Sequence, residues 1–234
     1  MPARASLYGL LKILAVALLI LLAVFVSLTA TAAALYPGGT WCDKSSPGFD
    51  LAQNFLCDLL HERALNGTAN PGATLARTGM LSLAVALVPF WLGVAELVRA
   101  RPVLASATRA FGVISALGTA LVSLNPSDRF AALHQTAVLG TTVSALAAAL
   151  SGCVGLYLAP GGRGLATLGG LSLVLAGIDG FLYLRQVFSP VACATLLPVV
   201  QKLAGLLVLA WMLAVAARLS RRPTAASPTR SRAR

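Results

Sequence analysis

The sequence predicts an all-α membrane protein built as a bundle of six transmembrane helices. Of its 234 residues, 58% are hydrophobic and only 11% are charged, whereas a soluble domain carries roughly 25% charged residues. The mean hydropathy is +0.84, which excludes an ordinary water-soluble globule. A bilayer core of about 30 Å requires roughly 20 consecutive apolar residues in a helix. Six such runs are present, at 9–35, 78–98, 103–124, 130–158, 164–186 and 191–217.

The first run, 9–35, also has features of a secretory signal peptide. Arg4 and Lys12 lie near its start, and the Ala-Thr-Ala segment at 30–32 resembles a cleavage site. However, the apolar run extends over about 20 residues, whereas the apolar region of a signal peptide has roughly 7–15 residues. We therefore expect this run to be retained as the first transmembrane helix.

The distribution of basic residues predicts the orientation of the six helices, because cytoplasmic segments are enriched in lysine and arginine. If the helices alternate, the side that holds both termini receives most of the arginines, and the other side receives the loop 36–77 with its mixed charges. We therefore expect a plasma-membrane protein with both termini in the cytoplasm. The basic residues on the expected cytoplasmic side are Arg4, Lys12, Arg99, Arg101, Arg109, Arg163, Arg218, Arg221, Arg222, Arg230, Arg232 and Arg234.

This arrangement accounts for the net charge of +11 without any nucleic-acid partner. Arginines at a cytoplasmic edge lie beside anionic lipid headgroups, so membrane lipids or a membrane-protein partner are expected, and nucleic acid is not. The segment 218–234 is rich in Ser, Thr, Pro and Arg, a composition typical of disorder. We expect 1–217 to form a single membrane domain, followed by a basic cytoplasmic tail.

The long outer loop, 36–77, is expected to contain a short amphipathic helix that lies over the mouth of the bundle. Asp50 is a suitable N-cap and Gly67 a suitable helix stop. Apolar residues recur every four positions on one face, beside a polar stripe, as an amphipathic helix requires. The apolar residues are Leu51, Phe55 and Leu59, and the polar ones are Asn54, Asp58, His61 and Glu62.

Two cysteines, Cys42 and Cys57, lie in this outer loop, on the side of the membrane where disulfides persist. A bond between them would close a loop of about 15 residues and stabilise the fold by about 3 kcal/mol. Cys193, near the outer end of the sixth run, is the alternative partner. Cys153 is interpreted as a small core residue.

Several segments of this loop resemble a known family. They are Tyr-Pro-Gly-Gly-Thr at 36–40, Asn-Phe-Leu-Cys-Asp at 54–58, Ala-Leu-Asn-Gly at 64–67 and Asn-Pro at 70–71. Followed by five more apolar runs, they resemble bacterial membrane proteins grouped as domain-of-unknown-function family 998. The resemblance covers about residues 8–217, and its specific part is this loop and the region of His134. It implies a six-helix bundle, distantly similar to the Frag/DRAM/Sfk group of eukaryotic membrane proteins, and implies no mechanism.

Ionisable residues inside apolar runs are candidates for function because they are costly to bury in a membrane. Glu96 ends the second run and Arg109 begins the third, and we expect a structural ion pair between them. Asp179 lies about 12 Å deep and Lys202 about 16 Å deep at the helical rise. A lysine stem can reach toward the interface, so the two can pair, either structurally or to handle a ligand or a proton.

A second group of polar residues, Asp58, His61 and His134, is expected near the outer end of the bundle. Asp58 and His61 are spaced i, i+3 and would share a helix face. The chain has only two histidines, so neither a metal site nor a cofactor is expected. The sequence also has no Gly-x-Ser-x-Gly, His-Glu-x-x-His or phosphate-loop motif.

Three functions are compatible with these residues. The favoured one is a non-enzymatic membrane protein that binds a lipid or a partner through the outer loop and a polar pocket beneath it, with Asn54 in the pocket. The first alternative is a small proton-coupled transporter that uses Asp179 and Lys202. The second is an intramembrane enzyme acting on a lipid, with Asp58, His61 and His134 as acid–base groups.

Overall fold

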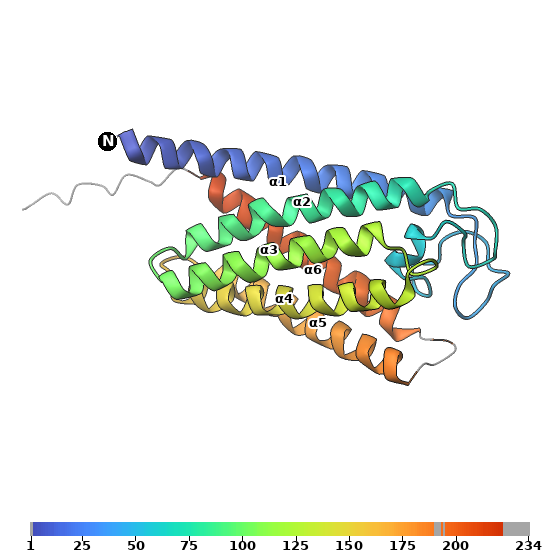
Figure 1. Cartoon of the computed structure of the whole chain (residues 1–234). Coiled ribbons are helices and arrows are strands. Elements are labelled where there is room, and N and C mark those ends of the chain that lie inside the picture. The colour runs from blue at the N-terminus through green and yellow to red at the C-terminus, as the bar shows by residue number, and fades with distance from the viewer. Residues whose placement is uncertain (1, 190–192, 194, 222–234) are drawn as a thin grey trace, which may run out of the picture.

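Six long helices form a single bundle in the computed structural model (Figure 1), which describes residues 2–189, 193 and 195–221. All six are long and apolar enough to cross a membrane. The predicted all-α architecture with six membrane-spanning helices is therefore confirmed. The helices are α1 (Pro2–Leu35), α2 (Ala73–Leu97), α3 (Pro102–Leu124), α4 (Ala131–Tyr157), α5 (Arg163–Phe188) and α6 (Leu196–Ser220).

The helix ends lie within three residues of those of the apolar runs, except that α1 begins seven and α2 five residues earlier than predicted, and α6 five residues later. Helix α2 begins at Ala73, five residues before the predicted start at 78, and so includes Arg77. The aliphatic stem of an arginine can lie along a helix while its charged end leaves the membrane. Here the Arg77 Nε donates a hydrogen bond to the Leu60 carbonyl in the outer loop. The predicted tail beyond residue 221 lies outside the described residues.

Consecutive helices pack side by side, and α6 closes the bundle against α1 and α2. Helix α6 ends at the same end of the bundle where α1 begins, and the 36–72 segment covers the opposite end (Figure 1). We call this segment the outer cap. Between its turns it contains one short helix, η1 (Leu56–Leu60).

The main apolar core fills the half of the bundle that is nearer the termini. Three large rings meet there: Phe90 and Trp91 on α2 and Trp211 on α6. Ring centroids of Phe90 and Trp211 are 5.0 Å apart, and those of Trp91 and Trp211 are 5.8 Å apart, both edge to face. Hydrogen bonds also join neighbouring helices, since Trp91 Nε1 donates to Ser115 Oγ of α3 over 3.1 Å.

The half of the bundle under the outer cap is packed differently. A smaller apolar cluster there joins Tyr36, Leu59 and Leu60 of the cap to Ala76 of α2 and Val122 of α3. Helix α5 contributes nothing to it. All of its buried residues lie in its first half, and residues 173–188 contain none. In Figure 1 the cap end of α5 lies at the edge of the bundle.

The cap contains a short helix, as predicted, but this helix differs from the expected one. It is a five-residue 3₁₀ helix that begins at Leu56, whereas the sequence suggested a longer helix from Asp50 to Gly67. The Asp50 carboxylate instead accepts hydrogen bonds from the Ala52 and Gln53 amides and closes a turn. These are the bonds of a helix N-cap, and the Asn54 backbone amide donates to the Asp50 carbonyl. The helical turn goes no further, and Leu51 is 70% exposed.

The close packing of α2 and α3 yields a testable prediction about Gly112. A Cβ added at Gly112 would lie 2.3 Å from Cγ of Trp91, so Gly112→Ala must displace the buried indole. We expect this variant to lose about 1–3 kcal/mol in free energy of unfolding. Gly170→Ala is the matched control, because nothing lies within 4 Å of its Cβ. Unfolding of the micelle-solubilised protein by SDS, followed by circular dichroism, measures the difference, and equal stability of the two variants would contradict the packing.

Candidate functional site

The outer cap begins with a tight turn at Gly38 and Gly39 that brings its two halves together. Gly39 has φ +86°, a left-handed conformation that favours glycine. A Cβ at this position would lie 2.3 Å from the backbone nitrogen of Asn66. No side chain fits there, so this position requires glycine. The Gly39 carbonyl accepts a hydrogen bond from the Asn54 side-chain amide over 2.9 Å.

Asn54 and Asp58 form the polar centre of the cap. Both are almost completely buried, at 0% and 2% exposure. Asn54 Nδ2 donates to Asp58 Oδ2 over 3.2 Å, and the Phe55 amide donates to the same oxygen over 2.8 Å. Trp41 Nε1 donates to the other oxygen, Oδ1, over 3.2 Å. One carboxylate therefore joins the first and second halves of the cap.

The electrostatics of Asp58 follow from this burial. Removal from water raises the pKa of its carboxyl group, and this is the largest effect. The hydrogen bond from Asn54 and the nearby charge of His61 act in the opposite direction, and so do the bonds from Phe55 and Trp41. No ion pair with Asp58 is found within the described parts of the chain, so hydrogen bonds alone satisfy it.

Two polar residues of α6 hold the cap onto the bundle. The Lys202 ammonium donates to the Asn54 carbonyl of the cap and to the Pro198 carbonyl of its own helix, 3.0 Å away in the second case. The Gln201 Oε1 accepts a hydrogen bond from the Leu56 amide over 3.0 Å. Lys202 was identified from the sequence, whereas Gln201 was missed. Gln201 lies next to Lys202 in an otherwise apolar run, and this adjacency is the sequence feature that could have identified it.

The predicted pairing of Asp179 with Lys202 is wrong. Lys202 binds two backbone carbonyls, as described above, and no ion pair joins it to Asp179. The Asp179 Oδ1 is buried without any hydrogen-bond partner. The depth of a residue along its helix does not determine the direction in which its side chain points around the helix axis. Lys202 points toward the outer cap and not toward Asp179.

The preferred disulfide, Cys42–Cys57, is also wrong. Cys42 of the cap is bonded to Cys193, the alternative partner, across 151 residues of sequence. Cys57 lies on η1 as a free thiol. Burial raises the pKa of Cys57 to about 12, and the charges of Asp58 and Asp179 add to this effect. Asp179 is therefore close enough to η1 for its charge to be felt there.

The two histidines have separate partners. His61 Nε2 is 2.7 Å from Ser127 Oγ in the α3–α4 connection, and His134 Nδ1 is 2.7 Å from the Asn125 carbonyl. No hydrogen bond joins Asp58, His61 and His134 to one another in the described chain. A search of the same residues finds no group of three or more His, Cys, Asp or Glu that could hold a metal ion. The acid–base role of these residues stays a prediction.

Ion pairs lie at both ends of the bundle. At the cap, Glu62 lies 2.8 Å from Arg129 and 3.6 Å from Arg77. At the opposite end Glu96 lies 3.9 Å from Arg109, as expected, but its shorter contact is 2.9 Å to Arg99.

These features define an integral, multi-pass membrane protein with one end of its bundle closed by a polar, hydrogen-bonded segment, the outer cap. No protein-family model, curated protein or solved structure matches the chain. The resemblance to family 998 stays a prediction.

The hydrogen bonds of Asp58 yield a second testable prediction. In Asp58→Asn one acceptor oxygen is replaced by an NH₂ group that faces the donors of Asn54, Phe55 or Trp41. A buried donor left without an acceptor costs about 1–3 kcal/mol, so we expect that loss in free energy of unfolding.

Asp50→Asn is the control for this substitution. Its Oδ1 can still accept from the Ala52 and Gln53 amides, because Asn and Asp are equivalent as caps. SDS unfolding and proteolysis of the cap measure both variants. Equal stability of Asp58→Asn and the wild type would show that these hydrogen bonds contribute little.

The four cysteines yield a third prediction. Alkylation without reduction, followed by peptide mapping, is expected to recover a Cys42–Cys193 linked peptide. Because the pKa of Cys57 is about 12, only about one thiol in 10⁴ is ionised at pH 8. Free cysteine has a pKa of about 8.5 and reacts as the thiolate, so native Cys57 should react on the order of 10³-fold more slowly.

The rate at Cys57 should rise about tenfold per pH unit between pH 7 and 9, because the thiolate fraction does. The denatured protein is the control, in which Cys57 should react as fast as a free cysteine. A linked Cys42–Cys57 peptide, or fast native alkylation at pH 8, would contradict the arrangement of the cap.

Proposed function

We propose that this chain is a non-enzymatic protein of the plasma membrane, with both termini in the cytoplasm, that binds a lipid beneath its outer cap. The lipid would enter from the outer leaflet beside the cap end of α5. Its headgroup would meet Asp179 and Lys202, and the cap would cover it. Membership in family 998 is part of this proposal and adds no substrate.

The observation that carries this proposal is the buried Asp179 Oδ1, which has no hydrogen-bond partner. A buried polar atom without a partner costs free energy unless water or a ligand supplies one. This oxygen lies on the part of α5 that contains no buried residue. Asp179 as a whole is half-buried, so a headgroup that displaces the side chains over its Oδ1 would supply the missing partner.

The charges and donors on the two helices indicate the class of headgroup. Asp179 provides an acceptor for an ammonium group. Lys202 has three donors, of which two are used by carbonyls, and the third is left for a phosphate. A headgroup that carries both an ammonium and a phosphate, as in phosphatidylethanolamine, complements both side chains.

The transporter alternative is supported by the same unpaired carboxylate. Among the described residues Asp179 has no ion-pair partner, so it could bind and release a proton as substrate crosses. This alternative has a different readout, namely proton uptake by proteoliposomes that disappears in Asp179→Asn. Proteoliposomes that take up no protons with any tested substrate would oppose it.

The lipid proposal yields a fourth prediction. We expect the wild type to bind phosphatidylethanolamine about tenfold more tightly than phosphatidylcholine with the same acyl chains. The quaternary ammonium of phosphatidylcholine has no N–H to donate, and a hydrogen bond to a charged group contributes about 1.5–3 kcal/mol. Asp179→Asn should reduce this preference to less than about threefold. Native mass spectrometry of the micelle-solubilised protein measures both affinities.

Asp43→Asn is the matched control, since it makes the same change at an exposed position of the cap. It should keep the full preference. Equal binding of the two lipids by the wild type, or an unchanged preference in Asp179→Asn, would refute the proposed site.

A further inference from the structure

The end of the bundle opposite the cap is strongly basic. Arg99, Arg101, Arg109, Arg163, Arg218 and Arg221 lie there, at helix ends or in the short connections. Glu96 is the acidic residue at this end, and it pairs with Arg99 and Arg109. Within the described part of the chain, Arg163 and Arg218 have no acidic partner.

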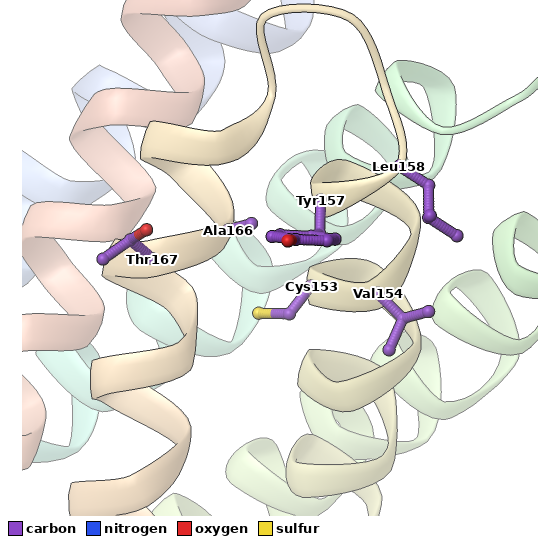
Figure 2. A pocket seen from close by; sticks show the side chains of 6 residues that line it. All are labelled: Cys153, Val154, Tyr157, Leu158, Ala166 and Thr167. Carbon is purple, nitrogen blue, oxygen red and sulfur yellow. The ribbon is translucent and has the colours of Figure 1, made fainter.

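An apolar groove lies between α4 and α5 at this same end (Figure 2). Its volume is about 330 Å³. Cys153 and Tyr157 project from α4 toward α5, whereas Val154 and Leu158 project to the other side of α4 (Figure 2). Ala166 and Thr167 of α5 also line the groove. The groove is open to the side, so in a membrane its occupant comes from the lipid phase.

Arg163 lies beside this groove, and Arg218 lies at the turn that joins α4 to α5. The Arg163 guanidinium lies over the Tyr157 ring, 5.6 Å from its centroid, and Tyr157 is a lining residue. Arg218 reaches the α4–α5 turn, where its Nη2 would be 3.3 Å from a Cβ on Gly161. Both side chains are exposed. Two unpaired cations therefore flank the turn above an apolar groove.

We propose that this groove and its two arginines form a binding site for an anionic phospholipid of the leaflet at the terminal end. One acyl chain lies in the groove against Cys153 and Ala166, and the phosphate binds the guanidinium groups of Arg163 and Arg218. The stacked Tyr157 ring holds Arg163 in place. This site is independent of the one proposed beneath the cap, at the other end of the bundle.

Charge and shape together select this occupant. A guanidinium binds phosphate through two parallel hydrogen bonds, and basic pockets at the ends of transmembrane helices bind anionic headgroups. An apolar groove alone would accept any acyl chain, whereas unpaired arginines beside it add a preference for net negative charge. A free phosphate would satisfy the arginines but leave the groove empty.

The test is native mass spectrometry of the full chain in micelles with phosphatidylglycerol and phosphatidylcholine of equal chain length. We expect the wild type to bind phosphatidylglycerol at least tenfold more tightly. Arg163→Ala combined with Arg218→Ala should lose that preference. Arg99→Ala is the matched control, because it removes one positive charge at the same end from an arginine already paired with Glu96. It should change the affinity less than twofold.

Two further measurements separate the parts of the site. Thr167→Trp fills the groove from an exposed position and should weaken binding of phosphatidylglycerol about tenfold without changing charge. Competition on the wild-type protein needs no variant: neither inorganic phosphate nor deacylated glycerophosphoglycerol should displace the lipid at millimolar concentration.

Four results would each overturn the proposal. They are no headgroup preference in the wild type, an unchanged preference in the double variant, an equal loss in Arg99→Ala, and displacement by free phosphate. Binding by Thr167→Trp as tight as that of the wild type would show that the acyl chain does not occupy the groove.

Discussion

The outer end of this protein depends on one buried carboxylate, that of Asp58. It accepts hydrogen bonds from the Trp41 indole, the Asn54 amide and the Phe55 backbone. Without it, these three donors would lose their acceptor, and the Asn54 amide among them is completely buried. The same bonds place the Asn54 carbonyl and the Leu56 amide where Lys202 and Gln201 of α6 can reach them. The hydrogen bonds of Asp58 therefore both organise the cap and position the groups that attach it to the bundle.

The bundle divides into two halves with different sources of cohesion. Near the termini, rings such as Trp91 and Trp211 pack against the neighbouring helices, and dispersion in a dense interior dominates. Beneath the cap, polar contacts hold the helices to the loop, and the second half of α5 has no buried residue. The other helices therefore cover this half of α5 only in part.

The helices could be predicted because membrane thickness requires long apolar runs, a constraint that acts on each segment separately. The contacts could not, because they depend on the directions in which side chains point. Depth along the helix placed Asp179 and Lys202 near one another, but Lys202 turned to the Asn54 carbonyl. Proximity in sequence favoured Cys57 as the partner of Cys42, but the folding of the loop brought Cys193 closer. The sequence placed Asn54 and Asp58 in one polar stripe, but it did not predict which groups they would bind.

The bond between Cys42 and Cys193 has a consequence for how the protein is made. The two cysteines are 151 residues apart, and four membrane-spanning helices lie between the cap and Cys193. During synthesis, Cys42 is translated long before its partner, which follows it by 151 residues. For that interval the only other thiol nearby is Cys57. The native bond therefore cannot form until α5 and Cys193 have been synthesised, so it is present only in chains that have reached the last helical hairpin.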